Sequence, residues 1–122
     1  MSTALDLVFE KTRAENRAAL IAYIPAGFPS KSGCEKAIRA LADAGVDAIE
    51  IGFPYSDPIM DGPTIQEAAD ISLKGGTNAA DVFSALKVAS DTGVASVVMT
   101  YWNPIEKYGV NEFAQSIADN GG

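Results

Sequence analysis

The stretch A-I-E-I-G-F-P-Y-S-D-P-I-M-D-G-P-T at Ala48–Thr64 joins an apolar strand pattern to a helix through a loop rich in proline and acid. Glu50 interrupts the apolar run, and burying a carboxylate among isoleucines is costly unless a partner or a raised pKa relieves the charge. Two further acids, Asp57 and Asp61, follow in the loop. A strand, an acid-bearing loop and then a helix is the order in which α/β enzymes present catalytic groups.

Compact apolar runs occur along the chain, including the one just described. Three of them predict buried strands, at Ala19–Ile24, Asp47–Ile51 and Ala95–Tyr101. Helical spacing predicts a leading helix that ends near residue 16, and further helices whose expected first caps are Ser32, Thr64, Asn78 and Asn111. Residues 102–109 are expected to form a loop. Alternating strands and helices imply parallel strands with right-handed crossovers.

The length of the chain limits how such strands can be arranged. Three parallel strands fit either an open doubly wound sheet or part of a (β/α)₈ barrel, and a complete barrel needs about 250 residues. The chain has 122 residues. As a barrel it would hold only the first three βα units, with strands four to eight absent. Two strand edges and the barrel interior would then be exposed, which invites self-association.

Composition excludes several classes of protein. The apolar fraction is 48% and the net charge is -7, so a core is available but a basic surface for nucleic acid is not. One cysteine and no histidine exclude an internal disulfide, Cys/His zinc sites and Ser-His-Asp catalysis. Asp6 and Glu10 interrupt any signal-peptide pattern, and no apolar run is long enough to span a membrane. These features predict a soluble, cytoplasmic protein.

Glu50 is the first candidate catalytic residue. Side chains alternate along a strand, so Ala48, Glu50 and Gly52 share one face, and the small neighbours suit a crowded barrel interior. The carboxylate lies near the end of the strand where barrel active sites form. The alternative is a structural Glu that pairs with an interior Lys, Arg or backbone amide. Every charged residue between Arg39 and Lys74 is an acid, which favours the catalytic interpretation.

Other polar residues follow the ends of the strands. Asp57 precedes a proline, where an Asx-turn is an ordinary explanation, and Asp61 precedes a helix start, where it can serve either the helix dipole or catalysis. Tyr23 and Tyr101 end the first and third strands and either line the same mouth or serve as core aromatics. Two carboxylates in different environments can act as acid and base together.

Three segments make the chain similar to one known family. The stretch E-I-G-F-P-Y-S-D-P-I-M-D-G-P-T-I-Q at Glu50–Gln66 resembles the signature of the tryptophan synthase alpha chain. So do I-A-Y-I-P-A-G-F-P at Ile21–Pro29 and V-V-M-T-Y-W-N-P-I-E-K-Y-G at Val97–Gly109. They follow the order and spacing of the family and span nearly the whole chain. Phe28 and Trp102 depart from common family residues, at variable positions.

The resemblance implies a (β/α)₈ barrel that cleaves indole-3-glycerol phosphate to indole and glyceraldehyde 3-phosphate in tryptophan biosynthesis. By motif position, Glu50 matches the general acid/base that protonates the indole carbon bearing the side chain. Asp61 matches the acid that contacts the indole N–H. Tyr23, Met99 and Tyr101 match positions that pack around the indole.

The resemblance also implies a partner. Pro54, Asp57, Pro58 and Asn103 match positions that dock on the beta chain in an alpha2beta2 complex. That partner holds pyridoxal phosphate and consumes the indole, whereas neither a cofactor nor a metal ion is expected on this chain. The phosphate-binding loops belong to the last two βα units of the family, so these residues alone are expected to be inactive.

Two other functions remain open at this point. A metal-dependent aldolase of the same barrel class would use Glu50, Asp57 and Asp61 to hold a divalent ion. The other alternative is a non-catalytic barrel fragment that associates with itself.

Overall fold

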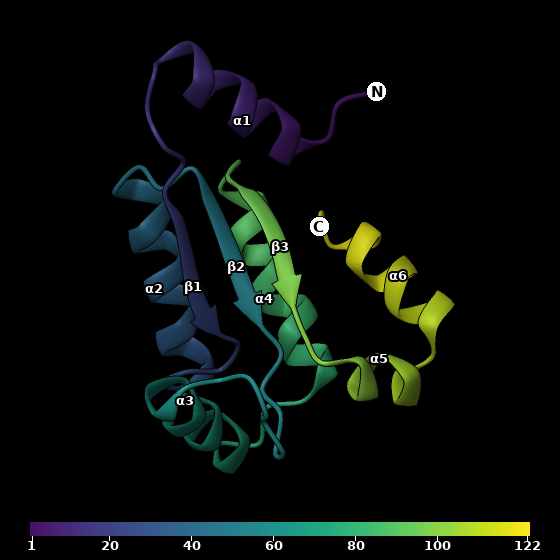
Figure 1. Ribbon diagram of the computed structural model, residues 1–122. Coiled ribbons are helices and arrows are strands. Elements are labelled where there is room, and N and C mark those ends of the chain that lie inside the picture. The colour runs from purple at the N-terminus through teal and green to yellow at the C-terminus, as the bar shows by residue number, and fades with distance from the viewer.

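The computed structural model describes residues 1–122 and contains one parallel sheet of three strands in the order β1-β2-β3. The strands are β1 (Ile21–Pro25), β2 (Ala48–Gly52) and β3 (Ala95–Met99). Figure 1 shows them side by side and running in the same direction. The three predicted strands are therefore confirmed, although β1 begins later and β3 ends earlier than the apolar runs suggest.

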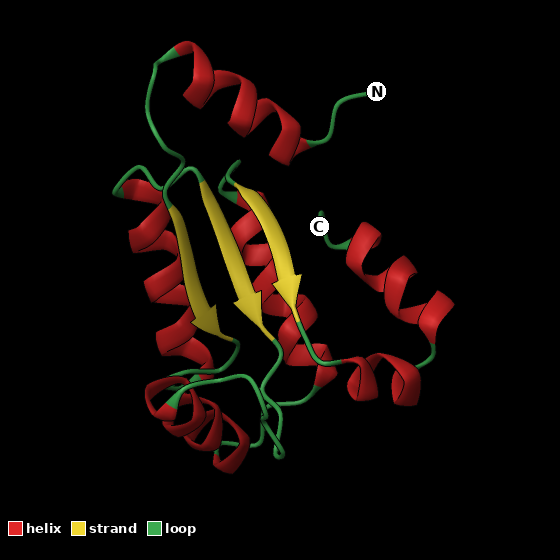
Figure 2. Cartoon of the chain, viewed as in Figure 1, coloured by secondary structure: helices red, strands yellow, loops and turns green.

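Helices connect and flank these strands. The crossover from β1 to β2 is α2, and α3 and α4 together form the crossover from β2 to β3. Figures 1 and 2 show α2 and α4 behind the sheet, α1 at the end where the strands begin, and α5 and α6 beside β3. The helices are α1 (Ala4–Ala14), α2 (Lys31–Asp43), α3 (Pro63–Lys74), α4 (Ala79–Asp91), α5 (Trp102–Tyr108) and α6 (Val110–Asp119).

The two faces of the sheet have different environments. Ile49 and Ile51 of β2 are fully buried, and they pack against α2 and α4 in a single hydrophobic cluster. The helices contribute Cys34, Ile38, Val82, Ala85 and Ala89 to that cluster. Glu50, on the opposite face of β2, remains partly exposed. One face thus forms a core, while the other has no helix over it (Figure 1).

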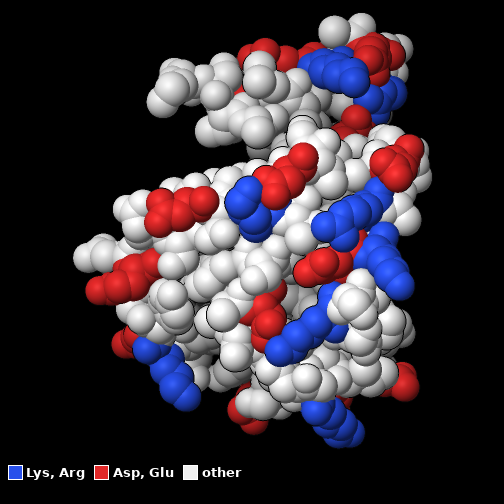
Figure 3. All heavy atoms as spheres, turned by 180° about the vertical axis from the view of Figure 1, so that it is seen from behind, with Lys and Arg blue, Asp and Glu red and all other residues white.

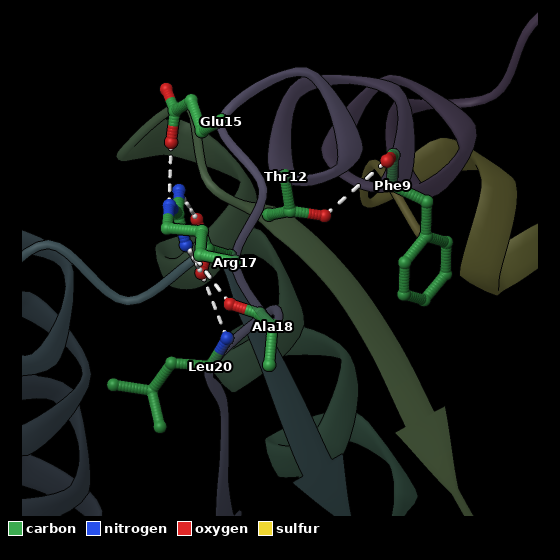
Figure 4. A network of polar contacts seen from close by, with 7 residues as sticks. Phe9, Thr12, Glu15, Arg17, Ala18 and Leu20 are labelled. Atoms are coloured by element: carbon green, nitrogen blue, oxygen red, sulfur yellow. Dashed lines mark hydrogen bonds and ion pairs between the residues drawn. The ribbon is translucent and has the colours of Figure 1, made fainter.

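An ion pair fixes the segment between α1 and the sheet. The guanidinium of Arg17 donates two hydrogen bonds to the Asp47 carboxylate, at 2.7 and 2.8 Å, and the Leu20 amide donates a third at 2.8 Å. Figure 4 shows Arg17 also reaching back to Glu15 at the end of α1. The Arg17 contact and the Leu20 amide hold the pKa of the Asp47 carboxyl well below its usual value. Asp47 precedes β2, so this group joins α1 to the first residues of the sheet.

At three of the four predicted helix starts, the residue that caps the helix is not the one that the sequence predicts. Asn78 caps α4 as expected, in a capping box with Asp81. The cap of α2 is Ser30 rather than Ser32, because the Ser30 hydroxyl accepts the Gly33 N–H at 3.0 Å. Thr64 does not cap α3, which begins one residue earlier, at Pro63. Proline suits a first helical position because the N–H that it lacks would have no partner there.

The segment after β3 is helical rather than a loop. Residues 102–108 form α5, and α6 begins at Val110, so Asn111 is not its cap. Gly109 lies between the two helices with a φ of 109°, which favours glycine and lets the chain turn sharply. Pro104 suggests a loop from sequence, but it lies in the first turn of α5, where a missing N–H costs nothing.

Aromatic packing attaches this helical pair to the rest of the molecule. Phe113 of α6 is 6% exposed and stacks on Phe53, which follows β2, with ring centroids 6.3 Å apart. It also meets Phe83 of α4 edge to face at 5.6 Å, and Tyr108 of α5 meets the same Phe83 ring at 5.4 Å. Edge-to-face pairs at these distances are favourable. The cluster therefore holds α6 against α4 and the residue that follows β2, and Tyr108 holds α5 against α4.

The surface carries mixed charge. Seen from behind in Figure 3, Lys and Arg side chains are interspersed with Asp and Glu side chains rather than gathered in one patch. No helix has both the length and the apolar character that crossing a membrane would require.

Candidate active site

The parallel register places two candidate residues next to each other. Tyr23 of β1 pairs with Glu50 of β2, and Glu50 pairs with Val97 of β3. Paired residues on neighbouring strands project from the same face of a sheet. Tyr23, Glu50 and Val97 therefore form one row across the open face, at the middle of the three five-residue strands.

The last row on the same face of the sheet explains why the final residue of β2 is a glycine. Gly52 pairs with Pro25 and Met99, and the Tyr23 ring lies across it. A Cβ atom at Gly52 would lie 2.1 Å from the Tyr23 hydroxyl oxygen and 2.6 Å from Cζ. No side chain fits at this position while the ring stays where it is. The sequence shows Gly52 as a small residue beside Glu50, but not the ring that requires it.

Both candidate acids act on the pKa of Tyr23. Burial raises the pKa of Tyr23 to about 12, and the charges of Asp61 and Glu50 and the Tyr101 phenol act in the same direction. Like charges near a phenol disfavour its ionised form. The register places Tyr23 beside Glu50, and a backbone hydrogen bond joins Asp61 to Tyr101. The charges of both carboxylates reach the Tyr23 phenol.

Glu50 has no partner in this region. Its side chain is half-buried, and it makes no hydrogen bond or ion pair with another residue of the chain. The structural alternative, a Glu satisfied by an interior cation or amide, is therefore absent within these residues. The open face leaves the carboxylate in contact with water, which removes the cost expected for a fully buried charge.

Asp61 lies at the end of the β2–α3 loop, one residue before the Gly62 cap of α3. Its carbonyl oxygen accepts a hydrogen bond from the Gln66 side chain at 2.7 Å, which fixes the loop to the first turn of the helix. Its backbone N–H donates to the Tyr101 hydroxyl oxygen at 3.3 Å. The carboxylate itself is half-exposed and makes no helix cap.

Tyr101 and Met99 lie at the end of β3. Met99 is half-buried on the open face, in the row that includes Gly52. Tyr101 follows the strand and directs its hydroxyl oxygen at the β2–α3 loop. The resemblance implies that the Tyr101 ring packs against substrate. It does not reveal that the Tyr101 hydroxyl contacts Asp61, 40 positions earlier in the chain.

Three of the four residues predicted at the partner interface surround one hollow. Pro54, Asp57 and Asn103 line a cavity of about 580 Å³ between the β2–α3 loop, the start of α4 and α5, whereas Pro58 does not line it. Asp57 and Asn103 are exposed, and Pro54 is buried. The Asp57 carboxylate accepts the Ser56 hydroxyl at 2.8 Å, so local bonding explains part of its position.

A second hollow, of about 410 Å³, lies between β1 and α3. Tyr23 is the only predicted site residue in its wall, which is mostly apolar and also includes Ile24, Pro25, Phe28, Ile65, Ala68 and Ile71. This hollow is beside the candidate acids rather than around them, so it does not define the site.

The carboxylates do not converge as metal ligands. No three side chains among the Asp, Glu and Cys residues lie close enough together to hold one metal ion. Glu50, Asp57 and Asp61 therefore do not form the three-ligand set that the metal-dependent aldolase hypothesis requires.

Comparison with known proteins identifies the family. The model of the tryptophan synthase alpha chain family matches residues 9–122. The chain belongs to the tryptophan synthase alpha chain family. The resemblance predicted from the three sequence segments is thereby confirmed, together with its implication of a (β/α)₈ barrel, of which this chain contains three strands.

Sequence relatives extend the match. The tryptophan synthase alpha chain of Salinispora arenicola is 51% identical over 118 residues, which cover 97% of this chain and 44% of the relative. That of Thermobifida fusca is 50% identical over 120 residues, or 98% of this chain and 44% of the relative. The chain thus spans less than half the length of these alpha chains.

Solved structures give the same result. A tryptophan synthase structure from M. tuberculosis superposes with a TM-score of 0.96 at 48% identity, over 99% of this chain and 49% of that one. The alpha subunit from Legionella pneumophila str. Paris superposes with a TM-score of 0.94 at 32% identity, over 100% of this chain and 47% of that one. The three strands and their helices therefore have the arrangement found in these alpha subunits.

Proposed function

We propose that this chain supplies the acid–base residues of a tryptophan synthase alpha-type lyase. The reaction is the retro-aldol cleavage of indole-3-glycerol phosphate to indole and glyceraldehyde 3-phosphate. The observation that carries the proposal is that Glu50 lies without a partner on the open face of β2, beside Tyr23, and that Asp61 lies in the loop following the same strand, in a member of this family. Barrel enzymes place their catalytic groups at the carboxyl ends of the strands.

In this mechanism Glu50 delivers a proton to the indole carbon that bears the glycerol phosphate side chain. The bond between that carbon and the side chain then breaks, and its electron pair returns to the ring. The Glu50 carboxylate, which has given up its proton, accepts the proton of the side-chain hydroxyl that becomes the aldehyde, and this completes the cleavage. Asp61 contacts the indole N–H and stabilises the positive charge that the ring carries after protonation. A carboxylate positioned at a developing cation needs no reorganisation during the reaction.

Indole fits the surroundings of these acids. Tyr23, Met99 and Tyr101 provide aromatic and apolar surface beside Glu50, and we assign them to packing against the indole ring. A flat apolar substrate matches such a lining better than a sugar does. The chemistry needs no cofactor and no metal ion on this chain.

The partner in this proposal is a tryptophan synthase beta chain, which carries pyridoxal phosphate, in an alpha2beta2 complex. Asp57 and Asn103 are exposed beside the 580 Å³ hollow, as docking residues must be. Pro54 shapes the wall of that hollow, and Pro58 lies in the same loop.

The test uses a barrel-completed chain, in which residues 1–122 are followed by the remaining sequence of the Salinispora arenicola relative. We expect this protein to release indole from indole-3-glycerol phosphate. The 122 residues alone are expected to release none, because the phosphate-binding loops of the family lie in its last two βα units. An inactive, folded barrel-completed chain would contradict the proposal, and so would turnover by the 122 residues at the rate of the completed chain.

A further inference from the structure

One phenol oxygen accepts hydrogen bonds from three consecutive amides. The Tyr101 hydroxyl oxygen lies 3.2 Å from the Ile59 nitrogen, 3.0 Å from that of Met60 and 3.3 Å from that of Asp61. All three amides belong to the β2–α3 loop, whereas Tyr101 follows β3. This one side chain therefore joins the loop that bears a candidate acid to the neighbouring strand.

Little else holds that part of the loop. Ile59 and Met60 are 87% and 79% exposed, so they bury little apolar surface that would fix their backbone. The Gln66 side chain, in the first turn of α3, donates a hydrogen bond to the Asp61 carbonyl oxygen and so attaches Asp61 to that helix. The amides of residues 59–61 donate to one side-chain group, the hydroxyl of Tyr101.

A ring contact holds Tyr101, and a hydrogen bond holds the tyrosine on which it packs. Its ring packs on the Tyr55 ring, with centroids 5.2 Å apart and planes inclined by 34°. The Tyr55 hydroxyl oxygen accepts a hydrogen bond from the Asn103 side-chain amide at 3.0 Å. We call Tyr55, Tyr101 and Asn103 the tyrosine clasp. It connects both ends of the β2–α3 loop to the segment after β3.

We propose that Tyr101 is a positioning residue whose hydroxyl fixes the backbone of residues 59–61 and so holds the Asp61 carboxylate in place. The inference rests on the lyase function proposed above. It differs from a role in packing against substrate, because packing needs the ring and positioning needs the oxygen. Tyr101→Phe separates the two roles, since it keeps the ring and removes the acceptor.

The first test is amide hydrogen exchange, followed by NMR in the 122-residue chain. In Tyr101→Phe we expect exchange at Ile59, Met60 and Asp61 to become about tenfold faster, the effect of losing one ordinary hydrogen bond. Unchanged exchange at Ile49 and Ile51 shows that the variant is folded. The matched control is Tyr108→Phe, which removes a tyrosine hydroxyl that contacts only Ser116, at 3.3 Å. Equal exchange at residues 59–61 in the wild type and Tyr101→Phe overturns the proposal.

The second test is kinetic and uses the barrel-completed chain. We expect Tyr101→Phe to lower kcat about tenfold with KM nearly unchanged, because the ring that meets the substrate is retained. Combined with Asp61→Asn, it should lower activity no further than Asp61→Asn alone, because both changes act through one carboxylate. If the activity losses of Tyr101→Phe and Asp61→Asn instead multiply in the double variant, the positioning role is wrong.

The two tests also distinguish this inference from the function on which it rests. If the wild-type barrel-completed chain releases no indole, the proposed function fails, while the exchange measurement still decides whether Tyr101 holds the loop. If indole is released and loop exchange is unchanged in Tyr101→Phe, the function stands and the positioning role is wrong.

Discussion

Gly52 is the residue at which the geometry of the site is most sensitive to a single atom. We expect Gly52→Ala to lower the free energy of unfolding by about 1–3 kcal/mol, the usual cost of overpacking a fitted position. The added Cβ would lie 2.1 Å from the Tyr23 hydroxyl and force that ring away from β2. Urea unfolding measures the loss.

The matched control is Gly62→Ala. The added carbon there meets no atom within 4 Å. We expect its cost to be clearly smaller, limited to the loss of a glycine at a helix cap. Equal losses in the two variants would show that the Tyr23 ring does not depend on Gly52.

Among single residues, the sequence identifies the two candidate acids but not the side chains and amides that surround them. Glu50 is recognisable because a carboxylate in an apolar strand is unusual, and Asp61 because it precedes a helix in a familiar motif. The contact of Tyr101 with Asp61 is not recognisable, since it joins residues 40 positions apart through a backbone amide. Periodicity and local motifs carry no information about such contacts.

At the scale of elements, Asp47 provides a test of how α1 is attached. We expect Asp47→Asn to lower stability near neutral pH, because it removes the carboxylate that Arg17 and the Leu20 amide share. The folded-state pKa of Asp47 is depressed, so this contribution is present above its ordinary pKa and is lost as the pH falls through the lower value.

The measurement is urea unfolding of both proteins at a series of pH values. The gap between the wild type and Asp47→Asn should be widest near neutrality and close in acid. Asp43→Asn is the control, because Asp43 is exposed and has no ion-pair partner. A gap that stays constant with pH would contradict the assignment to the charged pair.

The order of the strands and of most helices follows from the sequence because these elements have an apolar period, and several of them end at glycine or proline. The sequence prediction fails where one residue type is compatible with both a loop and a helix. Pro104 and Gly109 suggest a loop, yet the proline falls in the first turn of α5 and the glycine turns the chain into α6. Aromatic packing on Phe83, which is distant in sequence, stabilises that helical pair.

For the molecule as a whole, the sheet is open at both outer strands. β1 and β3 each have one hydrogen-bonding edge without a strand partner, and Ile21 on β1 is 42% exposed. Such edges pair readily with other chains. We expect the 122-residue chain to associate with itself in a concentration-dependent way, observed by sedimentation velocity.

Ile21→Lys should reduce this association by placing a charge at the exposed edge strand. Lys107→Arg, which keeps the charge of an exposed side chain on α5, is the control. Sedimentation of the wild type as a monomer at every concentration would show that the open edges do not pair.

Glu50→Gln in the barrel-completed chain tests whether Glu50 is the acid–base group of a lyase. General acid–base groups contribute about 100- to 10,000-fold to rate, so we predict a loss in kcat of that order with substrate still bound. Glu10→Gln, at an exposed position on α1, should leave kcat unchanged. A Glu50→Gln protein that releases indole as fast as the wild type would contradict the account.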